Sequence, residues 1–261
     1  TNAQVMSWFM DEYSQTHGYT PGIVTGKPLE LGGSEGREAA TGRGTAIITR
    51  EAAEKWNIGL KGAKVVVQGF GNVGSYAAKF LHEYGCKIIG VSDISGGLYA
   101  PDGFDVEELF DYNYEHRTIK GYQYGKKITN EELLALECDF LIPAALGSAI
   151  NEDNVGSLNC KIIIEAANGP VTGEAADKLW KKKRAIIPDI LTNAGGVTVS
   201  YFEWVQNLQQ FKWPEVEINQ KLEQKMVAAF NEVYSVKENK NVPMRIASFM
   251  VAIDRVSTAY N

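Results

Sequence analysis

A glycine-rich segment beginning at Gly69 is the part of the sequence whose residue types and spacing point most clearly to chemistry. Gly69-Phe70-Gly71-Asn72-Val73-Gly74 has the GxGxxG spacing of loops that hold the pyrophosphate of a dinucleotide. The first glycine permits a tight turn, the second lets the phosphates approach the backbone, and the third lets a helix pack closely on the preceding strand. The segment therefore predicts a cofactor cradle.

The sequence on both sides of this segment supplies the strand and the helix that the motif requires. Lys64-Val65-Val66-Val67-Gln68 precedes it, and the amphipathic stretch 73–84 that follows ends at Gly85, a residue type that commonly terminates helices. The N-terminus of such a helix offers free N–H groups and the positive end of its dipole to phosphates. This context disfavours the alternative, a glycine turn that binds no ligand.

An acidic residue at the end of the second predicted strand bears on the choice of cofactor. Asp93 lies roughly 20 positions after the glycine segment, where a carboxylate accepts hydrogen bonds from the adenosine ribose. It would repel the 2′-phosphate of NADP, and no Lys or Arg occurs between Ile88 and His116 to offset that charge. We expect NAD as the cofactor. NADP is not excluded, because a basic residue from elsewhere in the fold could reach this point.

Short apolar runs alternate with amphipathic segments from Lys64 onward. Five β-branched runs indicate strands that are buried on both faces, as in a parallel sheet covered by helices: Val65–Val67, Ile88–Val91, Phe140–Ile142, Ile162–Ile164 and Ile186–Ile187. Helical spacing predicts helices at Ala3–Gln15, Thr41–Trp56, Val73–Tyr84, Asn130–Leu136, Gly173–Lys183, Asn219–Asn239 and Arg245–Tyr260. The pattern predicts an α/β fold with a doubly wound, Rossmann-like, mostly parallel sheet and flanking helices.

Composition excludes several other classes of protein. A net charge of −6 over 261 residues argues against nucleic acid as a partner, and no apolar run is long enough to span a membrane. The three cysteines are widely spaced, and neither they nor the three histidines form a metal-binding pattern, so we expect a reduced protein without a structural metal. The N-terminus does not have the character of a signal peptide, and we expect a cytoplasmic location. The chain lacks an initiator Met, which hints that it was cut from a longer one.

Several segments together resemble glutamate dehydrogenase, a member of the Glu/Leu/Phe/Val dehydrogenase family. The similarity covers essentially the whole chain in order, and the stretch from Asn193 to Trp204 is its most specific part. The segments that carry it are Ala40-Thr41-Gly42-Arg43-Gly44, the GxGxxG loop, Gly96-Gly97-Leu98-Tyr99-Ala100-Pro101-Asp102-Gly103 and Asn193-Ala194-Gly195-Gly196-Val197-Thr198-Val199-Ser200-Tyr201-Phe202-Glu203-Trp204.

The resemblance implies roles for residues at matching positions. Ser200 is expected to bind the γ-carboxylate of the substrate and Val197 to line its side-chain pocket. Thr41 and Asn193 are expected near the nicotinamide. The full set of expected cofactor-binding residues is Thr41, Gly69, Phe70, Gly71, Asn72, Val73, Gly74, Asp93, Ile94, Ala144, Ala145, Asn168 and Asn193.

Simpler interpretations remain open for three of these residues. Asn193 is a good helix N-cap, and the glycines after it would permit the turn into a helix. Ser200 could be a polar residue in the middle of a helix that bonds the preceding turn. Asn168 could belong only to a turn at the end of a strand.

The resemblance also implies a reaction and groups that this sequence lacks. Glutamate would lose its α-hydrogen as hydride to the nicotinamide, and the iminium would be hydrolysed to 2-oxoglutarate and ammonia, with a lysine and an aspartate as catalytic groups. In the family both lie upstream of the position that matches Thr1, and Lys27 does not match the lysine motif. We therefore expect a chain that binds the cofactor but is inactive alone.

The expected organisation follows from the same resemblance. Residues 1–43 would be a remnant of the substrate domain and its linker, 44–242 the dinucleotide-binding domain, and 243–261 a C-terminal helix that returns toward the substrate domain. The family forms hexamers, so a homo-oligomer is expected. Two alternatives remain: a dehydrogenase of branched-chain or aromatic amino acids, which Ser200 disfavours, and a nucleotide-binding module without a catalytic role.

Overall fold

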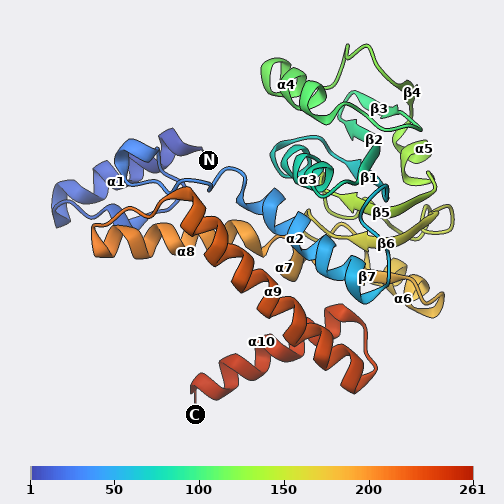
Figure 1. Cartoon of the computed structure of the whole chain (residues 1–261). Coiled ribbons are helices and arrows are strands. Elements are labelled where there is room, and N and C mark those ends of the chain that lie inside the picture. Colours follow the sequence, from blue (N-terminus) through green and yellow to red (C-terminus); the bar gives the residue numbers. More distant parts are fainter. Residues whose placement is uncertain (1, 261) are drawn as a thin grey trace.

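The computed structural model describes residues 2–260 and contains a seven-stranded sheet with the order β4-β3-β2-β1-β5-β6-β7 (Figure 1). Strands β2, β1, β5, β6 and β7 are parallel, and β3 and β4 extend the sheet at one edge as antiparallel strands. The strands are β1 (Lys64–Gln68), β2 (Lys87–Asp93), β3 (Gly96–Tyr99), β4 (Lys126–Ile128), β5 (Cys138–Pro143), β6 (Cys160–Ile164) and β7 (Ala185–Ile187). The predicted α/β fold with a mostly parallel sheet is confirmed.

Ten α-helices accompany the sheet within the described residues. They are α1 (Ala3–His17), α2 (Ala40–Lys55), α3 (Asn72–Glu83), α4 (Val106–His116), α5 (Asn130–Leu134), α6 (Gly173–Lys181), α7 (Asp189–Thr192), α8 (Ala194–Gln209), α9 (Glu215–Lys240) and α10 (Met244–Tyr260). Two short 3-10 turns, Pro21–Ile23 and Leu29–Leu31, interrupt the glycine-rich segment between α1 and α2. None of the helices in the described part of the chain is long and apolar enough to cross a membrane.

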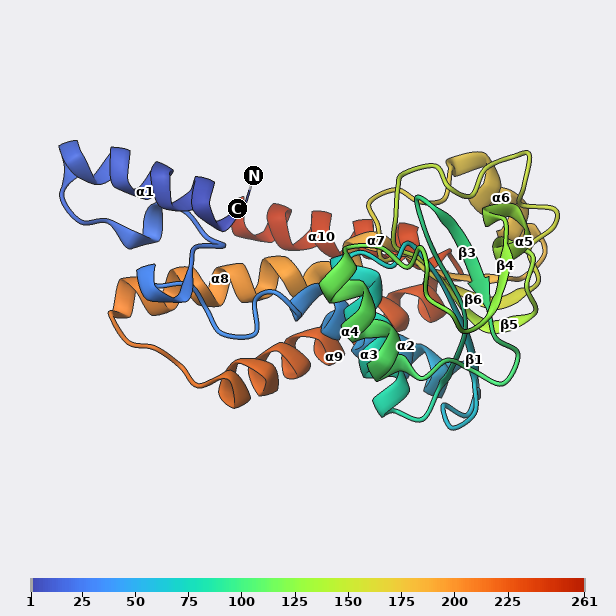
Figure 2. The same cartoon turned by 90° about the horizontal axis from the view of Figure 1, so that it is seen from above.

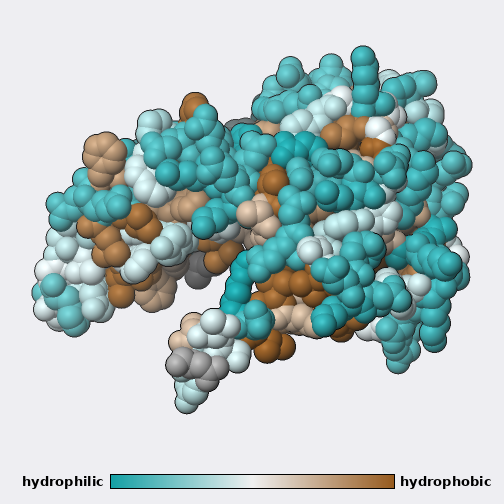
Figure 3. Space-filling model, turned by 60° about the horizontal axis from the view of Figure 1, so that its bottom comes forward, coloured by the Kyte–Doolittle hydropathy of each residue, from teal (hydrophilic) through white to brown (hydrophobic). Residues whose placement is uncertain are grey.

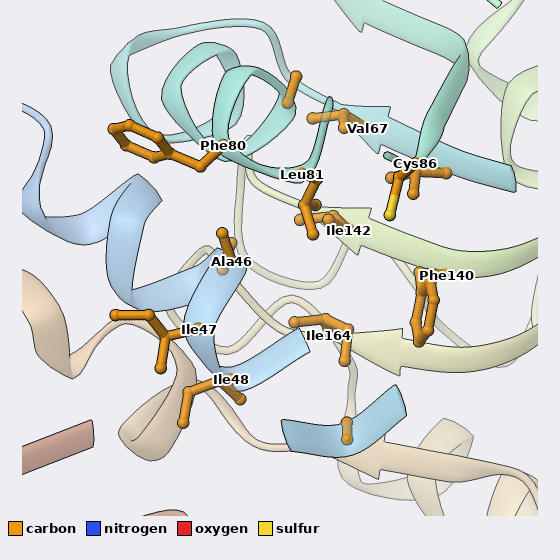
Figure 4. Close-up of a cluster of buried hydrophobic side chains, with 14 of the residues drawn as sticks. Ala46, Ile47, Ile48, Val67, Phe80, Leu81, Cys86, Phe140, Ile142 and Ile164 are labelled. Carbon is orange, nitrogen blue, oxygen red and sulfur yellow. The ribbon is translucent and has the colours of Figure 1, made fainter. Parts of the chain in front are cut away.

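The sheet is buried on both faces, which explains the continuous apolar runs of its strands. Val65 and Val67 point to one face, where α2, α3 and α9 pack, whereas Val66 points to the other face, toward α5 and α6. Figure 4 shows the first face, where Ala46 of α2 and Leu81 of α3 lie near Ile142 of β5. The core therefore holds the carboxyl ends of the strands rigidly at one edge.

The sheet and its covering helices form one body, from which α1 and α8 project side by side (Figures 1 and 2). Helix α2 crosses from this projection to the sheet, and α9 packs on α2, α8 and α10. Apolar side chains gather on the projecting part, as the brown areas on the left of Figure 3 show. The exposed ones on α1 and α8 and just beyond are Trp8, Phe9, Val197, Tyr201, Trp204, Leu208 and Phe211.

The five predicted strands are present, although β7, at one edge, is fully buried only at Ile187; β3, β4, α4, α7 and α8 are elements that the hydrophobic pattern did not indicate. Strand β3 begins with Gly96-Gly97, and glycine is depleted in strands. Strand β4 is a three-residue edge strand whose first two residues are the exposed Lys126 and Lys127. Such short edge strands pair through their backbones and leave little hydrophobic signal.

Candidate cofactor and substrate site

The glycine segment follows β1, the strand at which the chain changes from building one side of the sheet to building the other. From β1 the chain passes to β2 on one side, and the later strand β5 pairs with β1 on the other side. The segments that follow β1 and β5 meet at this edge: a Cβ on Gly69 would lie 2.7 Å from the Cβ of Ala145. Such a switch point is where open α/β sheets bind their ligands.

The three glycines of the motif have different environments. Gly69 has φ of 92°, in the left-handed region, and its N–H donates to the Ser92 carbonyl. A Cβ on Gly74 would overlap the Gly69 carbonyl oxygen, so only glycine lets α3 pack this closely. A Cβ on Gly71 would meet nothing within 4 Å. Gly71 therefore faces open space.

The first turn of α3 has free backbone donors beside this open space. Its N-cap residue, Gly71, has no side chain to cap it, and no residue between 2 and 260 accepts a hydrogen bond from the N–H groups of Gly71, Asn72, Val73 or Gly74. Phe70 differs, because its side chain is buried and its N–H donates to the Ser92 carbonyl. The free donors and the helix dipole fit a pyrophosphate.

Asp93 ends β2 beside this loop, and its carboxylate is held by four donors. One oxygen accepts from the N–H and the hydroxyl of Ser95, and the other from the Thr118 hydroxyl and the Ile119 N–H. Burial raises the pKa of Asp93, but these hydrogen bonds outweigh it and leave the pKa below its ordinary value. The carboxylate is therefore ionised at neutral pH, and the neighbouring Ile94 is fully exposed.

The ends of β5 and β6 carry the predicted residues on the other side of β1. The Ala144 N–H donates to the Gln68 carbonyl, which fixes the start of this segment, and Ala145 is exposed. Asn193 donates from Nδ2 to Asn168 Oδ1 at 2.7 Å and to the Ala166 carbonyl at 3.3 Å. Asn193 stands at the N-cap position of α8, as the simpler interpretation expected, but its side chain makes no capping hydrogen bond.

Ser200 lies on α8 with its hydroxyl facing an arginine from the segment before α2. Arg37 Nε donates to Ser200 Oγ at 2.8 Å, and both residues are half-buried. Ser200 does not bond the preceding turn of its own helix, so that alternative interpretation is wrong. Val197, almost one turn earlier, is 69% exposed. Arg37 was missed by sequence reasoning, although it lies four residues before Thr41 in the same segment.

Glycines at the crossing of α2 and α8 bring Thr41 to the same place. A Cβ on Gly195 would overlap the Ala40 carbonyl, and a Cβ on Gly196 would lie within 2.5 Å of Thr41 Oγ1. Asn72 joins this cluster, because its Nδ2 donates to the Glu38 carbonyl at 2.9 Å. The start of α2, the start of α3 and the first turns of α8 therefore converge.

A buried ion pair fixes the glycine-rich segment that precedes Arg37. Lys27 Nζ lies 2.7 Å from Glu203 Oε1, and both side chains have no exposed surface. Glu203 also accepts the N–H groups of Gly26 and Lys27, and Lys27 Nζ also donates to the Val24 carbonyl. Lys27 is thus fully engaged in structure.

A second buried carboxylate, Glu165, follows β6 directly. Burial raises the pKa of Glu165 to about 7, although the Arg245 guanidinium and the Asp189 N–H oppose this shift. No cluster of three His, Cys, Asp or Glu residues within 2–260 is arranged to hold a metal ion.

The raised pKa of Glu165 predicts a pH-dependent stability. The folded chain holds this proton more tightly than the unfolded chain, whose glutamate pKa is about 4.3, so the contribution of Glu165 is present below that pH and is lost as the pH rises through about 7. The free energies of unfolding in urea of Glu165→Gln and the unaltered chain should therefore differ by an amount that changes between about pH 4.3 and about pH 7. A constant difference across this range would contradict the assignment.

Comparisons with known proteins identify the family of the chain. The profile of the family described as Glutamate/Leucine/Phenylalanine/Valine dehydrogenase matches residues 32–261. A glutamate dehydrogenase of Thermotoga maritima is 54% identical over 261 residues, and the cryptic catabolic NAD-specific glutamate dehydrogenase of Bacillus subtilis is 50% identical over 260 residues. Each alignment covers 99% of this chain, which spans 63% and 61% of those relatives, or about three fifths of their length.

A solved structure extends the similarity to the arrangement of the elements. The hetero-hexameric glutamate dehydrogenase of Thermus thermophilus, in a leucine-bound form, superposes with a TM-score of 0.92 and 34% identity. The superposition covers 99% of this chain and 61% of that one. The family profile spans far more than half of the chain, and the fold agrees with that of the glutamate dehydrogenase structure. The chain belongs to the Glutamate/Leucine/Phenylalanine/Valine dehydrogenase family.

Proposed function

We propose that this chain provides the NAD-binding part of a glutamate dehydrogenase. The observation that carries the proposal is the set of free N–H groups at the start of α3, which face open space at Gly71 on the switch point of the sheet. In this proposal the pyrophosphate lies on the loop 69–74, the adenosine half extends over β2 toward Asp93 and Ile94, and the nicotinamide half extends over Ala144, Ala145 and the end of β6.

NAD, rather than NADP, is the cofactor that Asp93 favours. Its carboxylate carries a full charge at the end of β2, where it would oppose a 2′-phosphate. The relatives in Bacillus subtilis and Staphylococcus aureus are named as NAD-specific glutamate dehydrogenases, which supports the same choice.

The charge of Asp93 gives a direct test of cofactor choice. We expect the chain to bind NADH more tightly than NADPH, and Asp93→Ser to reduce this preference by at least about tenfold, because the repulsion is removed. Fluorescence titration with each cofactor measures both affinities. Asp102→Asn removes an exposed charge beyond β3, near the start of β2 and away from the loops, and should leave the preference unchanged. Equal affinities for NADH and NADPH in the unaltered chain would overturn the choice of NAD.

Arg37 and Ser200 are the groups that we propose for binding a carboxylate of the substrate. Arg37 donates from Nε to Ser200 Oγ. Its two terminal nitrogens and the Ser200 hydroxyl proton have no acceptors among residues 2–260. A guanidinium and a hydroxyl side by side provide charge-assisted hydrogen bonds to a carboxylate. The exposed Val197 would line the same pocket, and Thr41 would lie between this pocket and the nicotinamide.

The residues of this chain would bind and orient, and among residues 2–260 the site contains no group that we assign to proton transfer. The nicotinamide, when bound, supplies the hydride-accepting chemistry. Asn168 and Asn193 would orient it, and Arg37 and Ser200 would orient the substrate. Lys27 is held in its buried pair with Glu203 and is not free to act.

We therefore propose that the 261-residue chain binds NAD but turns over little or no glutamate. Absorbance at 340 nm with glutamate and NAD measures the rate, and a rate comparable to that of a complete glutamate dehydrogenase would contradict the proposal. The Thermus thermophilus enzyme is a hetero-hexamer, and we propose that the complete protein also forms an oligomer. In that assembly residues 1–43 and 243–261 would belong with the substrate domain.

A further inference from the structure

An arginine in the first turn of α10 binds two carboxylates near the end of β6. The Arg245 guanidinium donates to both oxygens of Glu165, at 2.5 and 2.6 Å, and to Asp189 Oδ1 at 3.3 Å. The Glu165 side chain is fully buried, whereas the Arg245 side chain is 28% exposed. Nη2 makes both bonds to Glu165 and Nη1 makes the bond to Asp189, so one planar guanidinium bridges the two carboxylates. This cluster ties α10 to the carboxyl end of the sheet.

The cluster continues through Asp189 to the turn that bears Asn168. The Asp189 N–H donates to Glu165 at 2.9 Å, and Asp189 Oδ2 accepts the N–H of Gly169 at 2.7 Å. Gly169 has φ of 57°, in the left-handed region, so this hydrogen bond holds a turn directly after Asn168. The Asp189 carbonyl also accepts the N–H of Asn193 at 2.9 Å. Asp189 therefore fixes the backbone next to Asn168 and the backbone of Asn193 itself.

The two asparagines offer a pattern of free groups that matches a carboxamide. Their mutual hydrogen bond uses Asn193 Nδ2 and Asn168 Oδ1. Asn193 Oδ1 and Asn168 Nδ2 remain without a partner within 2–260. One acceptor beside one donor matches the amino group and the carbonyl of a carboxamide. Arg245 makes no hydrogen bond to either asparagine.

We propose that Arg245 is a positioning residue for the nicotinamide, which through Glu165 and Asp189 holds Asn168 and Asn193 in place for the carboxamide. The inference rests on the proposed function, because it takes the dinucleotide to lie across β2, β1, β5 and β6. Strands β2 and β6 are separated by three strand spacings, roughly 14 Å, so the adenosine half lies far from the cluster. Replacing Arg245 should therefore weaken binding of the nicotinamide half and leave binding of the adenosine half unchanged.

Comparing the affinities of two ligands that share the adenosine half distinguishes the positioning role of Arg245 from a general loss of structure. NADH and ADP-ribose both present a pyrophosphate to the loop 69–74, but only NADH carries nicotinamide. By calorimetric titration at pH 8, above the pKa of Glu165 at about 7, we expect Arg245→Met to weaken NADH binding at least about tenfold and ADP-ribose binding by less than about twofold. Arg245→Lys keeps the charge, but its single nitrogen cannot bridge Glu165 and Asp189 as the two terminal nitrogens of arginine do, so its loss of NADH affinity should be intermediate. Glu165→Gln should show the same split as Arg245→Met.

A second arginine on α10 provides the control. Arg255 forms an exposed ion pair with Glu232, and Arg255→Met should change neither affinity. Equal weakening of both ligands in Arg245→Met and Glu165→Gln, or no weakening in either variant, would overturn the positioning role. Failure of the unaltered chain to bind either ligand would instead overturn the proposed function. If Arg245→Met does not fold, Arg245→Lys and Glu165→Gln provide the same comparison.

Discussion

Replacing Glu203 with glutamine should lower the free energy of unfolding by about 3–5 kcal/mol, because it leaves the Lys27 ammonium buried without a counter-charge. The two side chains have no exposed surface, and within residues 2–260 the Val24 carbonyl is the only further acceptor of Lys27 Nζ. Urea unfolding followed by circular dichroism measures the change. The loss should be accompanied by looser attachment of the segment that precedes Arg37.

A double variant distinguishes the buried charge from a simple loss of packing. In Lys27→Met/Glu203→Gln no charge remains buried, and the glutamine oxygen still accepts a backbone N–H. We therefore expect the double variant to be more stable than Glu203→Gln alone. Glu232→Gln breaks the exposed pair with Arg255 and should cost less than about 1 kcal/mol. If the losses in free energy of unfolding of Lys27→Met and Glu203→Gln simply add up to the loss in the double variant, the interaction between the two residues would be contradicted.

Changing Gly71 to valine should weaken NADH binding by at least about tenfold while the chain still folds. The position has room for a side chain, since a Cβ meets nothing within 4 Å, and its φ of −78° is open to any residue. The side chain would fill the space that we assign to the pyrophosphate. Fluorescence titration measures the affinity, and the urea midpoint checks the fold.

Two other glycines provide the matched comparisons. Gly156 is exposed, has equal space around it and lies on the segment that enters β6 at the opposite edge of the sheet, so Gly156→Val should leave NADH affinity unchanged. Gly74→Ala should instead destabilise the fold, by about 1–3 kcal/mol, because the new Cβ overlaps the Gly69 carbonyl. Unchanged NADH binding by Gly71→Val would contradict the placement of the pyrophosphate.

The sheet was predictable because its central strands are buried on both faces. The run Val65–Val67 is apolar without interruption, and the structure shows Val66 facing α5 and α6 while its neighbours face α2 and α3. The two antiparallel strands leave no such pattern, because β3 has only four residues and begins with two glycines, and the edge strand β4 has only three and begins with two exposed lysines. Helix α8 was considered only as an alternative, since the glycines at its start, which serve a close helix crossing, weaken the helical pattern.

The loop 69–74 was predictable because its glycines are required by the turn and the helix start within the loop itself. The rest of the site depends on contacts between distant segments. Arg37 meets Ser200 across 163 positions and Lys27 meets Glu203 across 176. Nothing in a local window indicates such pairs. The order of the strands was needed to place Asn168 and Asn193 on the opposite side of β1 from Asp93.

The most direct test of the central claim is the response of the loop's own amides to the cofactor. In a nitrogen-15-labelled chain titrated with NADH, we expect the signals of Gly71, Asn72 and Val73 to shift as binding saturates, because these free N–H groups would donate to the pyrophosphate. The signal of Gly156, at the opposite edge of the sheet, should stay in place. Saturable binding of NADH that leaves the three loop signals unmoved, or the absence of binding, would contradict the account.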